Sequence, residues 1–168
     1  MQNNKRYVLA ERPTGMPDET HLKLEEVPMP VPGKDEVLLK TIYLSLDPYM
    51  RGRMNAGASY AKSVEVGEHM TGQTISQVLE SNSPDYASGD YVLSANGWQT
   101  HAVAPANTLY KLDPDQAPIS TGVGVLGMPG FTAYVGLREF GKPQAGETVV
   151  VSAAAGAVGQ VVGQIAKM

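Results

Sequence analysis

Apolar and polar positions alternate along much of the first 112 residues, as they do in β-strands that bury one face. Seven short segments show this alternation or are rich in β-branched and apolar residues. They are residues 5–11, 21–27, 37–45, 71–80, 91–94, 98–104 and 108–112. Turns that contain glycine or proline separate them at the spacing of an all-β barrel or sandwich. The first part of the chain is therefore predicted to be mainly β.

The pattern changes after residue 112. Residues 113–120 form a proline-bearing linker, and the apolar stretch 123–140 has helical spacing at Phe131, Tyr134, Val135 and Leu137. Pro129 suits the first turn of a helix, and Gly141-Lys142-Pro143 would end it. We therefore expect a domain boundary near residues 113–122, with helices beyond it.

The last twenty-one residues, 148–168, have the order strand, small-residue turn and helix. Residues 148–152 are predicted to form a buried strand, and apolar residues recur at helical spacing from Val158 onward. The turn carries Ala154-x-Gly156-x-x-Gly159, a variant of the glycine fingerprint that brings a helix N-terminus to a pyrophosphate. The segment resembles the first half of a dinucleotide-binding βαβ unit. Taken alone, it is equally compatible with a turn that serves only packing.

Composition excludes several classes of function. The 168 residues carry a net charge of −4 without a basic run, which argues against binding to nucleic acid or anionic membranes. No apolar run approaches a membrane span, and the N-terminus lacks the apolar region of a signal peptide, so we expect a cytoplasmic protein. Cysteine is absent, which excludes disulfides, thiolate metal sites and cysteine nucleophiles. The three histidines are scattered, and we expect no metal site.

The block LSLDPYMRGRM places an aspartate, a tyrosine and two arginines within a few residues. One interpretation is a turn held by an ion pair between Asp47 and an arginine. The other places Tyr49 in a cleft, where its phenol could donate a hydrogen bond to a substrate carbonyl. Tyr60, in the unpatterned stretch 52–67, is a second candidate phenol. No hydrolytic triad is recognisable.

Five blocks in this order carry a family resemblance: LSLDPYMRGRM, MTGQTISQVLES, SGDYVLSANGWQ, LGMPGFTAYVGL and AAAGAVGQVVGQIAK. Together they resemble the zinc-independent medium-chain dehydrogenase/reductases, in the branch of prostaglandin reductases (leukotriene dehydrogenases) and curcumin reductases. The resemblance implies an N-terminal GroES-like β-barrel, residues 1–118, followed by the start of an α/β Rossmann domain, residues 119–168. It also implies an NADPH-dependent enzyme that reduces the carbon–carbon double bond of α,β-unsaturated ketones and aldehydes.

The resemblance assigns roles to individual residues. Tyr49 and Tyr60 match tyrosines that line the substrate cleft. The match to the pyrophosphate-binding turn consists of Gly156, Ala157, Val158 and Gly159. The block near the nicotinamide is matched by Met128, Pro129, Gly130 and Thr132. Gly72-Gln73 stands where zinc-dependent relatives have a His-Glu pair, so the resemblance also implies no zinc.

A full member of this family continues for about as many residues again, so we expect a truncated protein. The absent part would hold the reader of the adenosine 2′-phosphate and the dimer interface, and a homodimer is expected for the full-length protein. Two hypotheses follow. In the first, the parent protein is an NADPH-dependent enone reductase. In the second, the 168 residues are a catalytically inactive folded barrel that needs the missing part or a partner.

Overall fold

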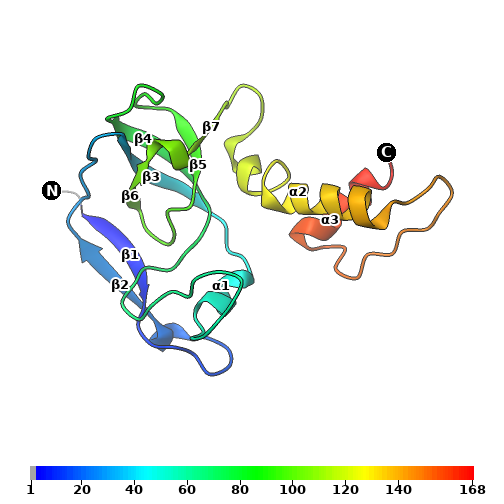
Figure 1. Ribbon diagram of the computed structural model, residues 1–168, viewed down its shortest axis with the longest axis horizontal. Coiled ribbons are helices and arrows are strands. Elements are labelled where there is room, and N and C mark those ends of the chain that lie inside the picture. Colours follow the sequence, from blue (N-terminus) through cyan, green and yellow to red (C-terminus); the bar gives the residue numbers. More distant parts are fainter. Residues whose placement is uncertain (1–2) are drawn as a thin grey trace. The chain divides into compact units, whose positions relative to one another are not determined.

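The computed structural model describes residues 3–168. Packing divides the chain into two compact units, the first ending at Pro114 and the second running from Asp115 to Met168. The first unit holds the strands and one short helix, and the second holds two longer helices (Figure 1). The division used for the domain prediction, after residue 118, stays a prediction.

The first unit contains two antiparallel sheets (Figure 1). One has two strands, β1–β2, and the other has five, in the order β6-β3-β4-β5-β7. Their bounds are β1 Asn4–Leu9, β2 Leu22–Val27, β3 Glu36–Leu44, β4 Thr74–Ser81, β5 Tyr91–Ser94, β6 His101–Pro105 and β7 Tyr110–Leu112. All seven predicted strands are present. The largest shifts are at β4, which begins at Thr74 instead of residue 71, and at β6, which begins at His101 instead of residue 98.

The five-stranded sheet is held by a core on one face. Val37 and Leu39 of β3 are fully buried on this face, and Leu38 between them, which points to the other face, is also buried. Val37 and Leu39 pack with side chains from the other strands and from the 3₁₀ turn Ala106–Thr108. The remaining members of this core are Val78, Val92, Ala104, Ala106 and Leu109, with Tyr86 packed against them.

A second apolar cluster lies under the segment that follows β3. It contains Leu9 from β1, Val64, and three methionines, Met50, Met54 and Met70. Backbone hydrogen bonds fix the chain around it: Tyr7 donates to the carbonyl of Trp98 at 2.9 Å and accepts from Met70 at 2.9 Å. This cluster anchors helix α1, Tyr49–Arg53, which the sequence reasoning had not predicted.

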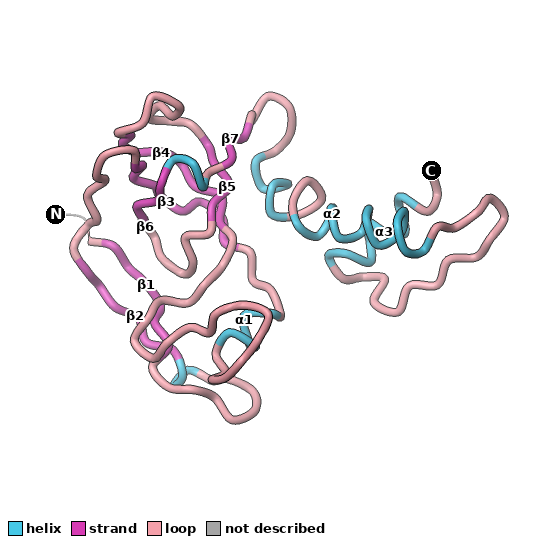
Figure 2. The backbone as a smooth tube through the Cα atoms, in the orientation of Figure 1, coloured by secondary structure: helices cyan, strands magenta, loops and turns pink. Residues whose placement is uncertain are grey.

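The second unit is built on α2, Met128–Val135, and α3, Ala157–Ile165, which pack against each other. Pro129 occupies the first turn of α2, as predicted. A 3₁₀ turn, Ile119–Val123, precedes α2, and a π-helical turn, Gly136–Gly141, continues it. That turn ends at Lys142, whose φ of +46° is left-handed. Both long helices are cyan in Figure 2, joined by a loop drawn in pink.

One predicted element of the second unit is wrong. Residues 148–152 do not form a strand, although their composition is that of one. A strand needs a neighbour to accept its backbone hydrogen bonds, and within residues 3–168 no strand pairs with this segment. Val150 is 89% exposed, so its apolar side chain is not covered either.

Candidate functional site

Helix α1 places Tyr49 at the surface of the second apolar cluster. The chain leaves β3 at Leu44, and Pro48, with a φ of −58°, is already in helical conformation at the N-cap. The side chain of Met50 is buried in the cluster, which fixes the rotation of the short helix. Tyr49 is thereby left partly buried against the same cluster, with its ring beside the guanidinium of Arg53.

Arg53 brings the two candidate tyrosines together. Its guanidinium carbon lies 5.6 Å from the centre of the Tyr49 ring and 5.4 Å from that of the Tyr60 ring. Both distances are in the range of cation–π attraction. Tyr60 is otherwise 84% exposed, so Arg53 is the contact that the described residues provide for its ring. The structure therefore joins Tyr49 and Tyr60, which the sequence placed eleven residues apart, on one cation.

The surroundings of Tyr49 keep its phenol protonated. Burial raises the pKa of Tyr49 above its ordinary value, and the carboxylate of Asp47 adds to the rise. The charge of Arg53 opposes this by favouring the phenolate. A tyrosine at its ordinary pKa of about 10 is already protonated at neutral pH, and the upward direction keeps Tyr49 a hydrogen-bond donor there.

The alternative interpretation of this block, an ion pair between Asp47 and an arginine, is not what the described residues show. Arg51 instead donates to the backbone carbonyls of Pro13 and Gly15, at 3.1 and 2.7 Å. Arg53 is the functional candidate that sequence reasoning missed. The available signal was the four-residue spacing from Tyr49, which puts both side chains on one face of a helix.

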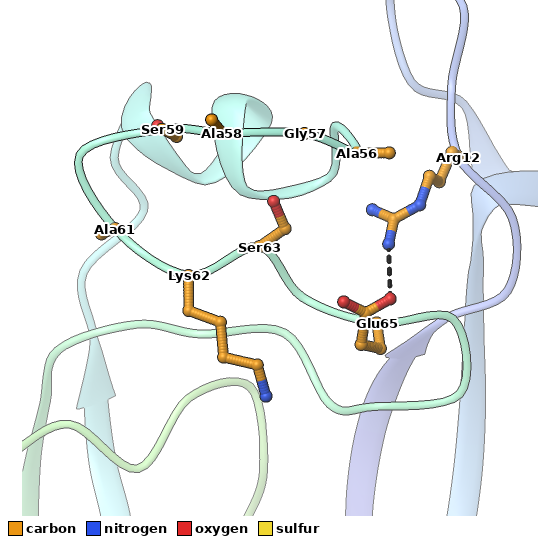
Figure 3. Close-up of a pocket in the computed structure, with 9 residues that line it drawn as sticks. All are labelled: Arg12, Ala56, Gly57, Ala58, Ser59, Ala61, Lys62, Ser63 and Glu65. Atoms are coloured by element: carbon orange, nitrogen blue, oxygen red, sulfur yellow. Dashed lines mark hydrogen bonds and ion pairs between the residues drawn. The ribbon is translucent and has the colours of Figure 1, made fainter.

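A pocket of about 420 Å³ lies beside the loop that carries Tyr60 (Figure 3). Small residues from Ala56 to Ser59 run along an arch, and the side chain of Arg12 lies near the Ala56 end of it. The guanidinium of Arg12 is held by Glu65 at 2.8 Å and by the carbonyl of Met54 at 2.9 Å. Neither candidate tyrosine lines this pocket.

Gly72 allows close packing next to this site. A Cβ atom there would lie 2.8 Å from Cδ1 of Leu44 and 2.9 Å from Cε of Met50, so a larger residue would push these two side-chain ends aside. No group of three or more histidine, aspartate or glutamate side chains within residues 3–168 is arranged to hold a metal ion.

The predicted pyrophosphate turn lies at the start of α3 in the second unit. Gly156 is the N-cap, without a side-chain cap, and Ala157 begins the helix. The first N–H groups of such a helix lack intrahelical acceptors and carry its positive dipole end. A Cβ atom at Gly159 would lie 2.0 Å from the carbonyl oxygen of Ala153, so glycine is required for the turn to pass this close to the helix. Gly156, Ala157 and Val158 are exposed.

Met128 and Thr132 lie on α2, which packs against α3. The side chain of Met128 is 57% exposed, and Thr132 is also exposed. These residues and the glycine turn therefore belong to one unit, whereas Tyr49 and Tyr60 belong to the other. In the described part of the chain, no helix is long and apolar enough to cross a membrane.

Comparison with known proteins identifies the family. A family model described as the N-terminal domain of oxidoreductase matches residues 5–112. Over 99% of its length the chain is 53% identical to the NADPH-dependent curcumin reductase of Escherichia coli, of which it covers 48%. The chain belongs to the zinc-independent medium-chain dehydrogenase/reductases. The resemblance drawn from the five sequence blocks is thus confirmed.

Other members of this reductase family agree. The chain is 44% identical to the NADP(+)-dependent 2-alkenal reductase of Nicotiana tabacum over 99% of its own length and 50% of that protein. The crystal structure of CurA from Vibrio vulnificus matches with a TM-score of 0.91 and 46% identity, over 98% of this chain and 48% of that one. CurA has also been crystallised in complex with NADPH. The predicted fold class, a GroES-like β-domain followed by the start of a Rossmann domain, is confirmed. The chain spans about half the length of these relatives.

Proposed function

We propose that the whole protein is an NADPH-dependent reductase of the carbon–carbon double bond in α,β-unsaturated ketones and aldehydes. The observation that carries this is the pair of phenols held on Arg53, of which Tyr49 keeps its proton. The relatives named curcumin reductase and 2-alkenal reductase support the substrate class. Tyr49 and Tyr60 are proposed to line the substrate cleft.

The proposed chemistry needs a hydrogen-bond donor at the carbonyl oxygen of the enone. When bound, NADPH supplies a hydride to the β-carbon of the enone. The π electrons would then move toward the carbonyl oxygen to give an enolate, and a proton from solvent would later add to the α-carbon. The Tyr49 phenol, partly buried and protonated, would donate a hydrogen bond to that oxygen as its charge develops. Tyr60 would bound the cleft from the adjoining loop.

The second unit fits a pyrophosphate. The turn before α3 approaches the helix closely only because Gly159 has no side chain, and the helix N-terminus at Gly156 is uncapped and exposed. We propose that Gly156, Ala157, Val158 and Gly159 bind the pyrophosphate through their backbone. Met128 and Thr132 are proposed to lie near the nicotinamide.

The test of the activity is NADPH oxidation by the whole protein in the presence of an enone, followed by absorbance. Tyr49→Phe should lower kcat/KM about 100-fold, because it removes the donor to the developing oxyanion but keeps the ring. Phe140, 83% exposed in the other unit, offers a control, and Phe140→Tyr should leave kcat/KM unchanged. No turnover with ketone and aldehyde enones would refute the activity, and unchanged kcat/KM in Tyr49→Phe would refute the assignment of Tyr49.

For the 168 residues by themselves we propose a folded scaffold without catalytic activity. This is favoured by residues 148–151, which have no strand partner within the described part of the chain, and by the exposure of Val150. The expected result of titrating the isolated chain with NADPH, followed by cofactor fluorescence, is weak binding or none. A micromolar dissociation constant would overturn this proposal.

Three further assignments belong to the same proposal. Residues 1–118 would form the substrate-binding domain and residues 119–168 the first part of the nucleotide-binding domain. The whole reductase is proposed to be a cytoplasmic homodimer acting on a small-molecule enone or alkenal. Cell fractionation and light scattering of the whole protein test the location and the dimer.

A further inference from the structure

Arg53 contacts the loop that follows it at several points. Its guanidinium stacks on the ring of Tyr60, and Nη1 donates a 2.8 Å hydrogen bond to the carbonyl of Lys62. Its backbone carbonyl accepts a 2.8 Å hydrogen bond from the amide of Val64. One residue therefore fixes both the side chain that projects from the loop and the point where the loop returns to the core.

The other side-chain contacts of the loop lie near its ends. Arg12 donates to the carbonyl of Met54 at 2.9 Å, Arg51 donates to Oδ1 of Asn55 at 2.7 Å, and Lys62 lies 3.6 Å from Glu68. Residues 55–60 are all exposed, and Gly57 adopts a φ of +111°. Among the described residues, the contact that the Tyr60 ring makes is with the side chain of Arg53.

The chemistry of arginine suits this position better than that of lysine. A planar guanidinium can present its faces to two aromatic rings while its edge donates to a carbonyl. The Nε atom of Arg53 is buried and has no hydrogen-bond partner among the described residues. The side chain is thus partly covered by the rings and the loop backbone.

We propose that Arg53 is a positioning residue that sets the separation of the Tyr49 and Tyr60 phenols and so determines the affinity for the enone. This rests on the proposed function. Arg53 does not touch the substrate; it acts through Tyr60 and the loop 54–63. Loss of the Arg53 side chain would free the exposed part of the loop, residues 55–60. The hydrogen bond from the amide of Val64 to the carbonyl of residue 53 would remain, because it is made by the backbone.

The first test uses the 168-residue chain and does not depend on activity. Backbone ¹⁵N order parameters (S²) are compared by NMR for the wild type, Arg53→Met and Arg138→Met. Arg138 is a matched control, since it stacks on Tyr134 at 5.5 Å in the second unit. Arg53→Met should lower S² across residues 55–63 by about 0.2 or more, with S² of β3 unchanged, and Arg138→Met should leave this loop as in the wild type.

Unchanged order parameters of the loop in Arg53→Met would overturn the proposal. If that variant unfolds the first unit, Arg53→Lys replaces it. Lysine retains the charge but lacks the planar fork, so the proposal expects a smaller fall in S² confined to the same residues. Wild-type order parameters in Arg53→Lys would count against the need for a guanidinium.

The second test uses the kinetics of the whole reductase. Arg53→Met should raise KM about 10-fold and change kcat by less than about threefold, because the chemistry at Tyr49 is retained. A loss of folded enzyme would instead lower kcat at unchanged KM. In a Tyr60→Leu background the added effect of Arg53→Met should shrink to about twofold or less, since both act through one ring.

Fully multiplicative effects of the two substitutions would overturn the proposed action through Tyr60. The outcomes of the two tests are independent of each other. If the whole protein reduces no enone, the proposed function is wrong, while the order-parameter measurement still decides whether Arg53 positions the loop.

Discussion

Two glycines of α3 have opposite surroundings although they lie one turn apart. A Cβ atom at Gly159 would meet the carbonyl oxygen of Ala153 at 2.0 Å and its carbon at 2.8 Å. At Gly163 a Cβ atom would have no atom within 4 Å. The first glycine is therefore required by the approach of the turn to the helix, whereas the second has no such steric reason. Comparing these two positions therefore distinguishes a glycine that the close approach of the turn requires from one that only lowers helix propensity.

Alanine at these two positions should have opposite effects on stability. Gly159→Ala should lower the free energy of unfolding of the second unit by about 1–3 kcal/mol, because the turn must move away from the helix. Gly163→Ala should raise it by up to about 1 kcal/mol, since alanine favours a helix over glycine. Urea unfolding followed by circular dichroism at 222 nm measures both. Equal effects of the two substitutions would show that the turn is not tightly packed.

At the scale of elements, residues 148–152 show that a strand-like composition is not sufficient to form a strand. Their β-branched residues would suit the centre of a parallel sheet, yet their backbone has no strand partner within residues 3–168. The neighbouring helix α3 forms nevertheless, because helical hydrogen bonds are local and Val161 is buried.

Matched valine-to-threonine substitutions test this difference. Val150→Thr should change the free energy of unfolding of the isolated chain by less than about 0.5 kcal/mol, since its side chain is 89% exposed. Val161→Thr, at a position only 8% exposed, should cost about 1–3 kcal/mol because it buries a hydroxyl. Denaturant titration measures both values. A cost at Val150 equal to that at Val161 would mean that residues 148–151 are covered in solution.

On the scale of the whole molecule, the partly buried side chain of His69 makes the free energy of unfolding depend on pH. Burial lowers the pKa of His69 below its ordinary value, and the nearby Arg6 lowers it further, while Glu68 acts in the opposite direction. The unfolded chain therefore binds a proton at a higher pH than the folded chain does. His101, 4% exposed, has its pKa lowered in the same direction by burial and by Lys40.

The free energy of unfolding should consequently fall as the pH drops through about 6.5, the value expected for unfolded histidine. The loss should be complete once the pH passes the lowered folded pKa values. His69→Gln should make the dependence between pH 7.5 and 5 less steep, because one of the two groups is removed. Urea unfolding at several pH values checks this. An identical slope in the variant would exclude His69 as a contributor.

Local pattern was enough to predict the seven strands, because β-branched and apolar runs such as Val37–Leu39 lie in the sequence itself. It was not enough for helix α1, whose five residues are too few to show a helical period. Nor could it show that residues 148–152 have no strand partner among residues 3–168. The candidate tyrosines could be named from the sequence, but their meeting on Arg53 depends on how the loop folds back, and their roles remain predictions.

The way the loop 54–63 is anchored has a consequence for how this fold can diversify. The two ends of the loop are joined by the backbone hydrogen bond between Arg53 and Val64. The side chain of Arg53 also donates to the carbonyl of Lys62. Insertions or deletions between Asn55 and Ser59 would leave both hydrogen bonds and the sheets in place. Doubling the length of a flexible loop costs only about 0.6 kcal/mol of closure entropy. New substrate ranges could therefore arise by changes in the length of this one segment, while the β-domain beneath it is inherited unaltered.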